Sequence, residues 1–249
     1  WGWRENRIKA IKNYIDLIMC LFKFECDFYS KKNMQSFFLG HPFNQLKPKN
    51  SDDIIEKYGL EASNSFISIL PGSRASEISE LMPIYILAAK KLLMLNPNAY
   101  FLIPAANKKL ADMIQSSKGI KEIPHKLSID SARDFLSISP ISIVTSGTAS
   151  LEAAVLGSTP IICYKTNRLN YAILSRLIST PFIGLPNLLL QKHIFPELLQ
   201  SDLTPDSIVT NYLKILSDPK KYQCFGSEIN DAMSGEGFEI AARTIKNLL

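Results

Sequence analysis

Two short glycine turns constrain the fold of this chain more than any other feature of its sequence. Residues 70–77 (LPGSRASE) and 145–152 (TSGTASLE) each follow an apolar run of strand type and each begin a stretch of helical type. Such turns place Gly72 and Gly147 at the carboxyl edge of a sheet, where free backbone N–H groups and the helix dipole favour an anion. The sequence therefore predicts an α/β protein in which both turns form a cradle for a nucleotide diphosphate.

Strand and helix patterns alternate through the middle of the chain. The expected strands are residues 66–70, 99–104, 126–129, 141–144 and 160–164, and the expected helices are residues 76–95, 108–116, 132–136, 149–156 and 170–178. This alternation predicts a parallel, Rossmann-like sheet flanked by helices. Residues 205–217, 221–232 and 241–249 have helical patterns with no strand between them, so we expect a helical C-terminal tail.

The first 45 residues have a different character. Apolar residues between Ile8 and Phe22 fall at helical spacing among basic residues, which predicts an amphipathic helix that either faces a core or lies on a membrane surface. The polar run 44–53 predicts a linker. The expected organisation is therefore an N-terminal segment (1–45), a nucleotide-binding domain (46–204) and C-terminal helices (205–249).

Composition excludes several classes of protein. The net charge is +5, and residues 1–50 hold nine Lys and Arg against four Asp and Glu, a local excess that argues against a general nucleic-acid binder. The four cysteines and three histidines form no metal-ligand or disulfide pattern, so a reducing, cytoplasmic setting is expected. No stretch is long and apolar enough to span a membrane. The chain begins at Trp1, without a signal pattern, and is expected to be part of something longer.

The residues of the first turn suit a phosphate. Arg74 follows Gly72 and Ser73 at the expected start of a helix, where its guanidinium could clamp phosphate oxygens beside free N–H groups. Its competing role is a salt bridge with Glu77. In the second turn, Ser146 and Thr148 flank the glycine, and they could cap the helix, donate hydrogen bonds to a ligand, or do both.

Three further polar residues follow the second turn. Glu152 lies in an otherwise apolar helix, so its carboxylate needs a partner, either a ribose diol or a nearby Lys or Arg. Asn187 follows a proline and either orients an amide toward a ligand or holds a turn, which is the default interpretation. Gln200 ends the segment 196–200 (PELLQ), in the same part of the chain.

Several other kinds of site are absent from the sequence. It has no GxGxxG, no phosphate-binding loop of the GxxxxGK[ST] type, no HExxH and no GxSxG. It also lacks an Asp-x-Asp pair that would hold a divalent metal on a sugar nucleotide. We therefore expect no metal and no cofactor, and a diphosphate whose charge is met by Arg74 and the helix ends.

In this order, LPGSRxxE, SGTASLE and LPN followed by PELLQ resemble the lipid-A-disaccharide synthase family. The opening residues 1–4 (WGWR) resemble the family's WAWR, residues 21–25 (LFKFE) are similar to LFPFE, and residues 38–42 (FLGHP) are similar to FVGHP. Six segments in the same order make the resemblance specific, and it runs through nearly the whole chain.

The resemblance implies a GT-B glycosyltransferase that joins UDP-2,3-diacylglucosamine to 2,3-diacylglucosamine 1-phosphate, giving lipid A disaccharide 1-phosphate and UDP. It implies a peripheral enzyme on the cytoplasmic face of a Gram-negative inner membrane, with the basic N-terminal region near lipid. A homodimer is a further expectation. The UDP site that it implies consists of Gly72, Ser73, Arg74, Ser146, Gly147, Thr148, Glu152, Asn187 and Gln200. Among these, Arg74 would contact the diphosphate and Glu152 the ribose.

The chain also departs from the family pattern. Lys23 stands where the family usually has proline, and the family's earlier GExSGD segment, with the acidic residues thought to activate the acceptor, does not occur here. We therefore expect residues 1–45 to be a remnant of the acceptor domain, the catalytic base to lie outside this chain, and the chain alone to be inactive. Two alternatives stay open. One is another GT-B sugar-nucleotide enzyme, such as a relative of UDP-N-acetylglucosamine 2-epimerase, whose first loop would need a histidine; the other is a non-catalytic UDP-binding module.

Overall fold

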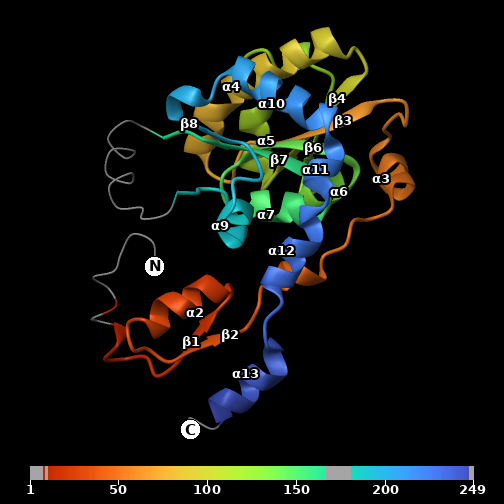
Figure 1. The fold of residues 1–249 in the computed structure, drawn as a ribbon. Coiled ribbons are helices and arrows are strands. Elements are labelled where there is room, and N and C mark those ends of the chain that lie inside the picture. The colour runs from red at the N-terminus through yellow and green to blue at the C-terminus, as the bar shows by residue number, and fades with distance from the viewer. Residues whose placement is uncertain (1–7, 9–10, 167–180, 247–249) are drawn as a thin grey trace.

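A computed structural model of the chain describes residue 8 and residues 11–166 and 181–246. The described elements form a large α/β domain and a small N-terminal unit, which lies with α13 on one side of that domain (Figure 1). The helix expected at residues 170–178 lies outside the described residues. No described helix has the length and apolar character needed to cross a membrane.

Among the described residues, six parallel strands form the sheet of the large domain, in the order β5-β4-β3-β6-β7-β8. The strands are β3 (Ser65–Leu70), β4 (Ala99–Ala105), β5 (His125–Ile129), β6 (Ile141–Thr145), β7 (Thr159–Tyr164) and β8 (Glu197–Leu199). The order reverses between β3 and β6, so the carboxyl ends of these two central strands lie at a topological switch point. The predicted strands are confirmed within about one residue at each end, and β8 was not anticipated.

Helices cover both faces of this sheet. They are α3 (Ser51–Tyr58), α4 (Ala75–Leu95), α5 (Lys108–Gln115), α6 (Ala132–Ile138), α7 (Thr148–Val155), α9 (Leu185–Leu190) and α10 (Pro205–Ser217), with short 3-10 turns η2 (Ile120–Glu122) and η3 (Gln200–Asp202). Side chains alternate along β3, so Ile67 and Ile69 enter the core under α4, whereas Phe66 and Leu70 face α6. The α/β fold class predicted from the sequence is confirmed.

The C-terminal helices begin within the same core. Ile208 and Ile215 of α10 are buried with residues of α4, and α10 packs directly against that helix. The expected boundary at residue 205 therefore marks a change of element type, from strand and helix to helix alone. The single helix expected at 221–232 is divided into α11 (Pro219–Gln223) and α12 (Phe225–Met233), and α13 (Gly237–Lys246) follows.

The small N-terminal unit corrects one prediction. Strand β1 (Ile18–Cys20) pairs in parallel with β2 (Ser36–Phe38), and α2 (Lys23–Ser30) connects them. The amphipathic helix expected through Phe22 is wrong over this stretch, because the backbone at Ile18–Cys20 pairs with another strand. Short apolar runs fit either kind of element, and only a pairing partner decides between them.

Two chain segments pass side by side between the small unit and the large domain. The His41 N–H donates to the Met233 carbonyl at 2.9 Å, and the Glu236 N–H donates to the Phe38 carbonyl at 3.0 Å. Gly40 and Gly235 lie where the segments cross, and a Cβ on Gly235 would lie 2.6 Å from the Gly40 Cα. The crossing is therefore close enough to require glycine.

The expected linker 44–53 is only partly a loop. Its first two residues belong to a 3-10 turn, η1 (Pro42–Gln45), and α3 begins at Ser51 after Asn50, whose side chain accepts the Asp52 N–H at 2.8 Å. An asparagine directly before an acidic first turn is a typical N-cap signal, so this helix start can be predicted from the sequence. The linker also contacts the domain, because Lys49 Nζ lies 2.5 Å from a carboxylate oxygen of Asp134 on α6.

Candidate functional site

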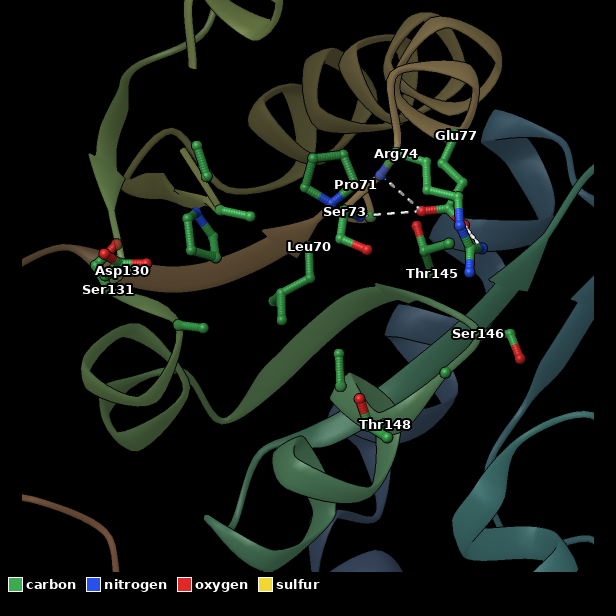
Figure 2. A pocket seen from close by; sticks show the side chains of 17 residues that line it. Leu70, Pro71, Ser73, Arg74, Glu77, Asp130, Ser131, Thr145, Ser146 and Thr148 are labelled. Carbon is green, nitrogen blue, oxygen red and sulfur yellow. Dashed lines mark hydrogen bonds and ion pairs between the residues drawn. The ribbon is translucent and has the colours of Figure 1, made fainter. Parts of the chain in front are cut away.

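The two glycine turns open into one cavity at the carboxyl edge of the sheet. Its volume is about 520 Å³, and it is lined by residues 70–74, 104–106, 130–132 and 145–149 together with Glu77. Figure 2 shows Arg74 and Glu77 at one side of the cavity and Asp130 and Ser131 at the opposite side. Of the nine predicted site residues, the structure brings six into this lining: Gly72, Ser73, Arg74, Ser146, Gly147 and Thr148.

The side chain of Glu77 packs against the backbone of the first turn. Gly72 has a φ of +104°, and a Cβ there would lie 2.8 Å from the Glu77 Cβ and closer still to its Oε2, so only glycine fits. Glu77 Oε2 accepts the N–H groups of Ser73 (3.0 Å) and Arg74 (3.2 Å), and Oε1 accepts from Arg74 Nη1 at 2.6 Å. Of the two roles considered for Arg74, the structure contains the salt bridge.

The second turn has no such carboxylate. The N-cap of α7 is Gly147, which has no side chain, and Ser146 Oγ donates to the Ile183 carbonyl at 2.9 Å. Of the roles considered for Ser146 and Thr148, the structure therefore does not contain the helix cap. Thr148 is exposed at the first helical position and lines the cavity. The first turn of α7 thus faces the cavity without a side-chain cap, which is the arrangement that binds anions.

A third loop, after β5, completes the cavity and was missed from the sequence. Asp130 has a φ of +52°, and its N–H donates to the Ala105 carbonyl at 3.1 Å. The next residue, Ser131, is buried, and its hydroxyl donates a hydrogen bond to the Ser128 carbonyl. The signal that could have found them is their position, because they follow a predicted strand at the same edge as both glycine turns.

Beneath the cavity, two buried hydroxyls join α4 to β6. Tyr85 Oη and Thr145 Oγ1 lie 3.2 Å apart, and complete burial raises the pKa of Tyr85 well above its usual value. Tyr85 therefore stays a neutral hydroxyl at any physiological pH. The pair fixes the end of β6, from which the second turn departs.

Glu152 lies one turn further along α7 and outside the cavity lining. Its Oε1 accepts from Arg133 Nε at 2.8 Å, and the Arg133 guanidinium lies 5.9 Å from the centre of the Phe43 ring. The sequence left two partners open for this carboxylate, a ribose and a basic side chain. The structure contains the second.

Asn187 is fully buried and does not line the cavity. Its Nδ2 donates to the Phe195 carbonyl and to Glu197 Oε1, each at 2.8 Å, and its Oδ1 accepts the N–H groups of Ile194 (3.1 Å) and Phe195 (2.9 Å). All its hydrogen-bonding capacity is used within the chain. Asn187 therefore lies within α9, where its side chain holds the loop that follows the helix, and it offers nothing directly to a ligand.

Glu197, which the sequence did not single out, extends this network. Its carboxylate also accepts the N–H groups of Ile183 and Gly184, each at 3.0 Å, and Ile183 is the residue whose carbonyl accepts from Ser146. Asn187 and Glu197 thereby hold the segment 183–184 against the second glycine turn.

Gln200 also lies outside the cavity lining. It has a φ of +48°, and its Nε2 is buried without a hydrogen-bond partner among the described residues. A buried amide in that condition is unfavourable unless something satisfies it. No group of three or more His, Cys, Asp or Glu in the described part of the chain could hold a metal ion.

Comparison with known proteins identifies the family. A family model described as Lipid-A-disaccharide synthetase matches residues 1–241. The chain belongs to this family. It is 33% identical to the lipid-A-disaccharide synthase of Alcanivorax borkumensis over all of the chain and 67% of that protein, and 35% identical to that of Hahella chejuensis over 87% of the chain and 56% of that protein. The chain thus spans between about half and two thirds of the length of these relatives.

Solved structures share the fold at low sequence identity. The S. aureus MnaA-UDP co-structure matches with a TM-score of 0.58 at 12% identity, over 96% of this chain and 61% of that one. A glycosyltransferase from Rickettsia africae matches with a TM-score of 0.55 at 12% identity, over 100% of this chain and 67% of that one. WaaG, a glycosyltransferase involved in lipopolysaccharide biosynthesis, matches with a TM-score of 0.51 at 12% identity, over 91% of this chain and 60% of that one. The fold is that of the GT-B glycosyltransferases, as predicted.

Proposed function

We propose that this chain is the donor-binding part of a lipid-A-disaccharide synthase and that its cavity holds UDP. The observation that carries this proposal is the pairing of two glycine turns, each opening a helix, around one cavity of about 520 Å³. Two helix N-termini and Arg74 suit a diphosphate. We propose UDP-2,3-diacylglucosamine as the donor and 2,3-diacylglucosamine 1-phosphate as the acceptor, a choice that membership of the family supports.

The proposed roles follow from the positions of the residues. Arg74 and the N–H groups of both turns would hold the diphosphate, and Thr148 lies at the cavity side of α7. Glu152 would exchange its arginine partner for ribose hydroxyls. Asn187 would act indirectly, by holding the loop that contacts Ser146. The buried, unpartnered amide of Gln200 supports its place near the ligand.

In the whole enzyme, the 6-hydroxyl of the acceptor would attack the anomeric carbon of the donor sugar. The bond from that carbon to the UDP oxygen breaks as the new glycosidic bond forms, with inversion, and the hydroxyl proton passes to a base that lies outside this chain. Arg74 and the helix N-termini stabilise the charge that develops on the departing UDP. We propose that this chain alone binds UDP and does not transfer sugar.

Family membership also suggests where the enzyme works. We propose a peripheral position on the cytoplasmic face of the inner membrane, with the basic N-terminal region toward the lipid. Support comes from the local excess of positive charge in residues 1–50 and from Tyr14 and Ile15, which are exposed next to Lys12.

Titration of the chain with UDP by isothermal calorimetry tests the assignment of the cavity. Arg74→Ala is expected to weaken UDP binding at least about tenfold, because it removes the one guanidinium that the described residues contribute to the cavity lining. Arg243→Ala on α13 removes the same charge at an exposed position far along the chain and should leave the affinity unchanged. Equal UDP affinity for the wild type and Arg74→Ala would remove Arg74 from the site.

A further inference from the structure

The carboxylate of Glu77 occupies the donors that a phosphate would use at the first turn. Oε2 accepts the N–H groups of Ser73 and Arg74, at 3.0 and 3.2 Å, and Oε1 accepts from the Arg74 guanidinium at 2.6 Å. Figure 2 shows these contacts at the edge of the cavity. The Glu77 side chain is 17% exposed and folds back over Gly72, whereas the Arg74 side chain is 77% exposed. One internal anion therefore uses three donors of the cradle at once.

The second turn provides the contrast. The helix N-terminus at Gly147 faces the same cavity and has no side-chain cap from the described residues. One of the two helix ends is thus covered by a carboxylate and the other is open. A ligand with two phosphoryl groups that spans the cavity reaches the first turn only where the Glu77 carboxylate already lies. Two anions cannot share those donors, since like charges at contact distance repel each other strongly in a partly buried site.

We propose that Glu77 is an internal competitor for the diphosphate, an inference that rests on the proposed function of the cavity. When the diphosphate binds, the carboxylate rotates away, and Ser73 N–H, Arg74 N–H and the Arg74 guanidinium exchange it for phosphoryl oxygens. Only hydrogen bonds change partners in this step. The free energy of diphosphate binding is then the difference between two interactions of the same donors, one with the phosphoryl oxygens and one with the Glu77 carboxylate. The site therefore releases UDP more readily than a site without this carboxylate would.

The competition makes a prediction that depends on the charge of the ligand. In Glu77→Gln the side chain keeps its length and one acceptor oxygen but loses its charge, so UDP should bind about five- to tenfold more tightly. Uridine, which has the same base and ribose but no phosphate, should bind the wild type and the variant equally. Calorimetric titration of the whole chain with each ligand measures both effects.

Glu80→Gln is the matched control. Glu80 is exposed on the same helix, one turn further along, and does not line the cavity. Removing its charge should leave the affinities for UDP and for uridine unchanged. This control separates a general change in charge near α4 from the loss of the competing carboxylate.

Glu77→Ala provides a second route, because it removes the side chain beyond Cβ and should also tighten UDP binding. Thermal unfolding shows whether each variant is folded, since the lost cap costs about 1 kcal/mol of helix stability. Unchanged or weaker UDP binding in both Glu77 variants would overturn the inference and assign Glu77 to capping or to orienting Arg74. A wild-type chain and variants that bind neither UDP nor uridine would instead overturn the proposed function of the cavity.

Discussion

Asp134 illustrates how one carboxylate joins three parts of the chain. Its oxygens accept from Lys49 Nζ (2.5 Å) in the linker and from Lys57 Nζ (2.7 Å) and Tyr58 Oη (2.8 Å) of α3. Burial raises the pKa of Asp134, but the hydrogen bonds from Lys49, Lys57 and Tyr58 outweigh it and lower the pKa from 3.8 to about 2. The charged carboxylate therefore stabilises the folded state.

The stabilisation by Asp134 should depend on pH in a direction that its pKa sets. A pKa that is lower in the folded state gives a contribution that is complete above the unfolded value and is lost as the pH falls toward 2. Asp134→Asn should therefore lower the free energy of unfolding by roughly 1 to 2 kcal/mol at pH 7, since the two lysines are solvent-exposed, and the difference should shrink between pH 4 and pH 2. Urea unfolding at a series of pH values measures it.

The control for Asp134 is Asp112→Asn. Asp112 pairs with Lys108 at 2.9 Å on the surface of α5, where both side chains are well exposed, so the cost should stay under about 0.5 kcal/mol at every pH. An Asp134→Asn cost that is the same at pH 7 and at pH 2 would contradict the assignment of the low pKa to the folded carboxylate.

The residue types in the sequence indicate which side chains are candidates for the site, but they do not show which groups those side chains contact in the fold. For Arg74 and for Glu152 the sequence left two kinds of partner open, a group of the ligand or a charged side chain of the chain. The structure pairs each of them with a charged side chain. The N–H groups that Asn187 satisfies belong to residues seven and eight positions later. No local pattern reveals such a contact, because it depends on the path of the loop between them.

At the scale of elements, length decided what the sequence could predict. The long helix α4 and the five longer strands each repeat a pattern several times, and their periodicity was readable. Strands β1, β2 and β8 have three residues each, which is too few for a period to appear. Helix α9 has six residues and begins with a leucine and a proline, so it resembled a turn. Pairing across the sheet, which joins Ile162 to Glu197, creates β8.

The hydrogen bonds of the Asn187 side chain in α9 can be tested by substitution. Asn187→Ala removes a side chain that satisfies two backbone N–H groups, one carbonyl and the Glu197 carboxylate, all at buried or partly buried positions. Leaving them unpaired should lower the free energy of unfolding by about 2 to 4 kcal/mol. Asn211→Ala is the control, because its side-chain amide donates to the Ser207 carbonyl of its own helix, and its effect should stay near 0.5 kcal/mol. Urea unfolding compares the two, and equal costs would contradict the structural role of Asn187.

At the scale of the whole molecule, two crossing segments and a row of rings join the small unit to the large domain. The His41 ring stacks on Phe22 with centres 5.1 Å apart and meets the Phe43 ring edge-on at 4.5 Å. Burial lowers the pKa of His41, and its Nδ1 accepts the Phe43 N–H at 3.2 Å, which requires an unprotonated nitrogen. The ring row therefore depends on a neutral histidine, and the backbone crossing at Gly40 and Gly235 lies next to it.

The crossing should be the most sensitive point of this connection. Gly235→Ala would place a Cβ 2.6 Å from the Gly40 Cα, and because the obstacle is backbone, no side chain can move aside to relieve it. The two segments must separate, at a cost of about 1 to 3 kcal/mol. We expect the amide protons of His41 and Glu236, which donate across the crossing, to exchange faster in the variant while those of β3 and β6 keep their protection.

Gly226→Ala is the matched control, since Gly226 lies in α12 with open space around the added methyl group and an ordinary backbone conformation. It should leave exchange at the crossing unchanged and raise stability by about 0.5 to 1 kcal/mol. If Gly235→Ala left the protection of His41 and Glu236 unaltered, the close approach of the two segments would not hold the small unit to the domain. The ring row around His41 would then be the main connection, and His41→Ala would be the substitution that loosens it.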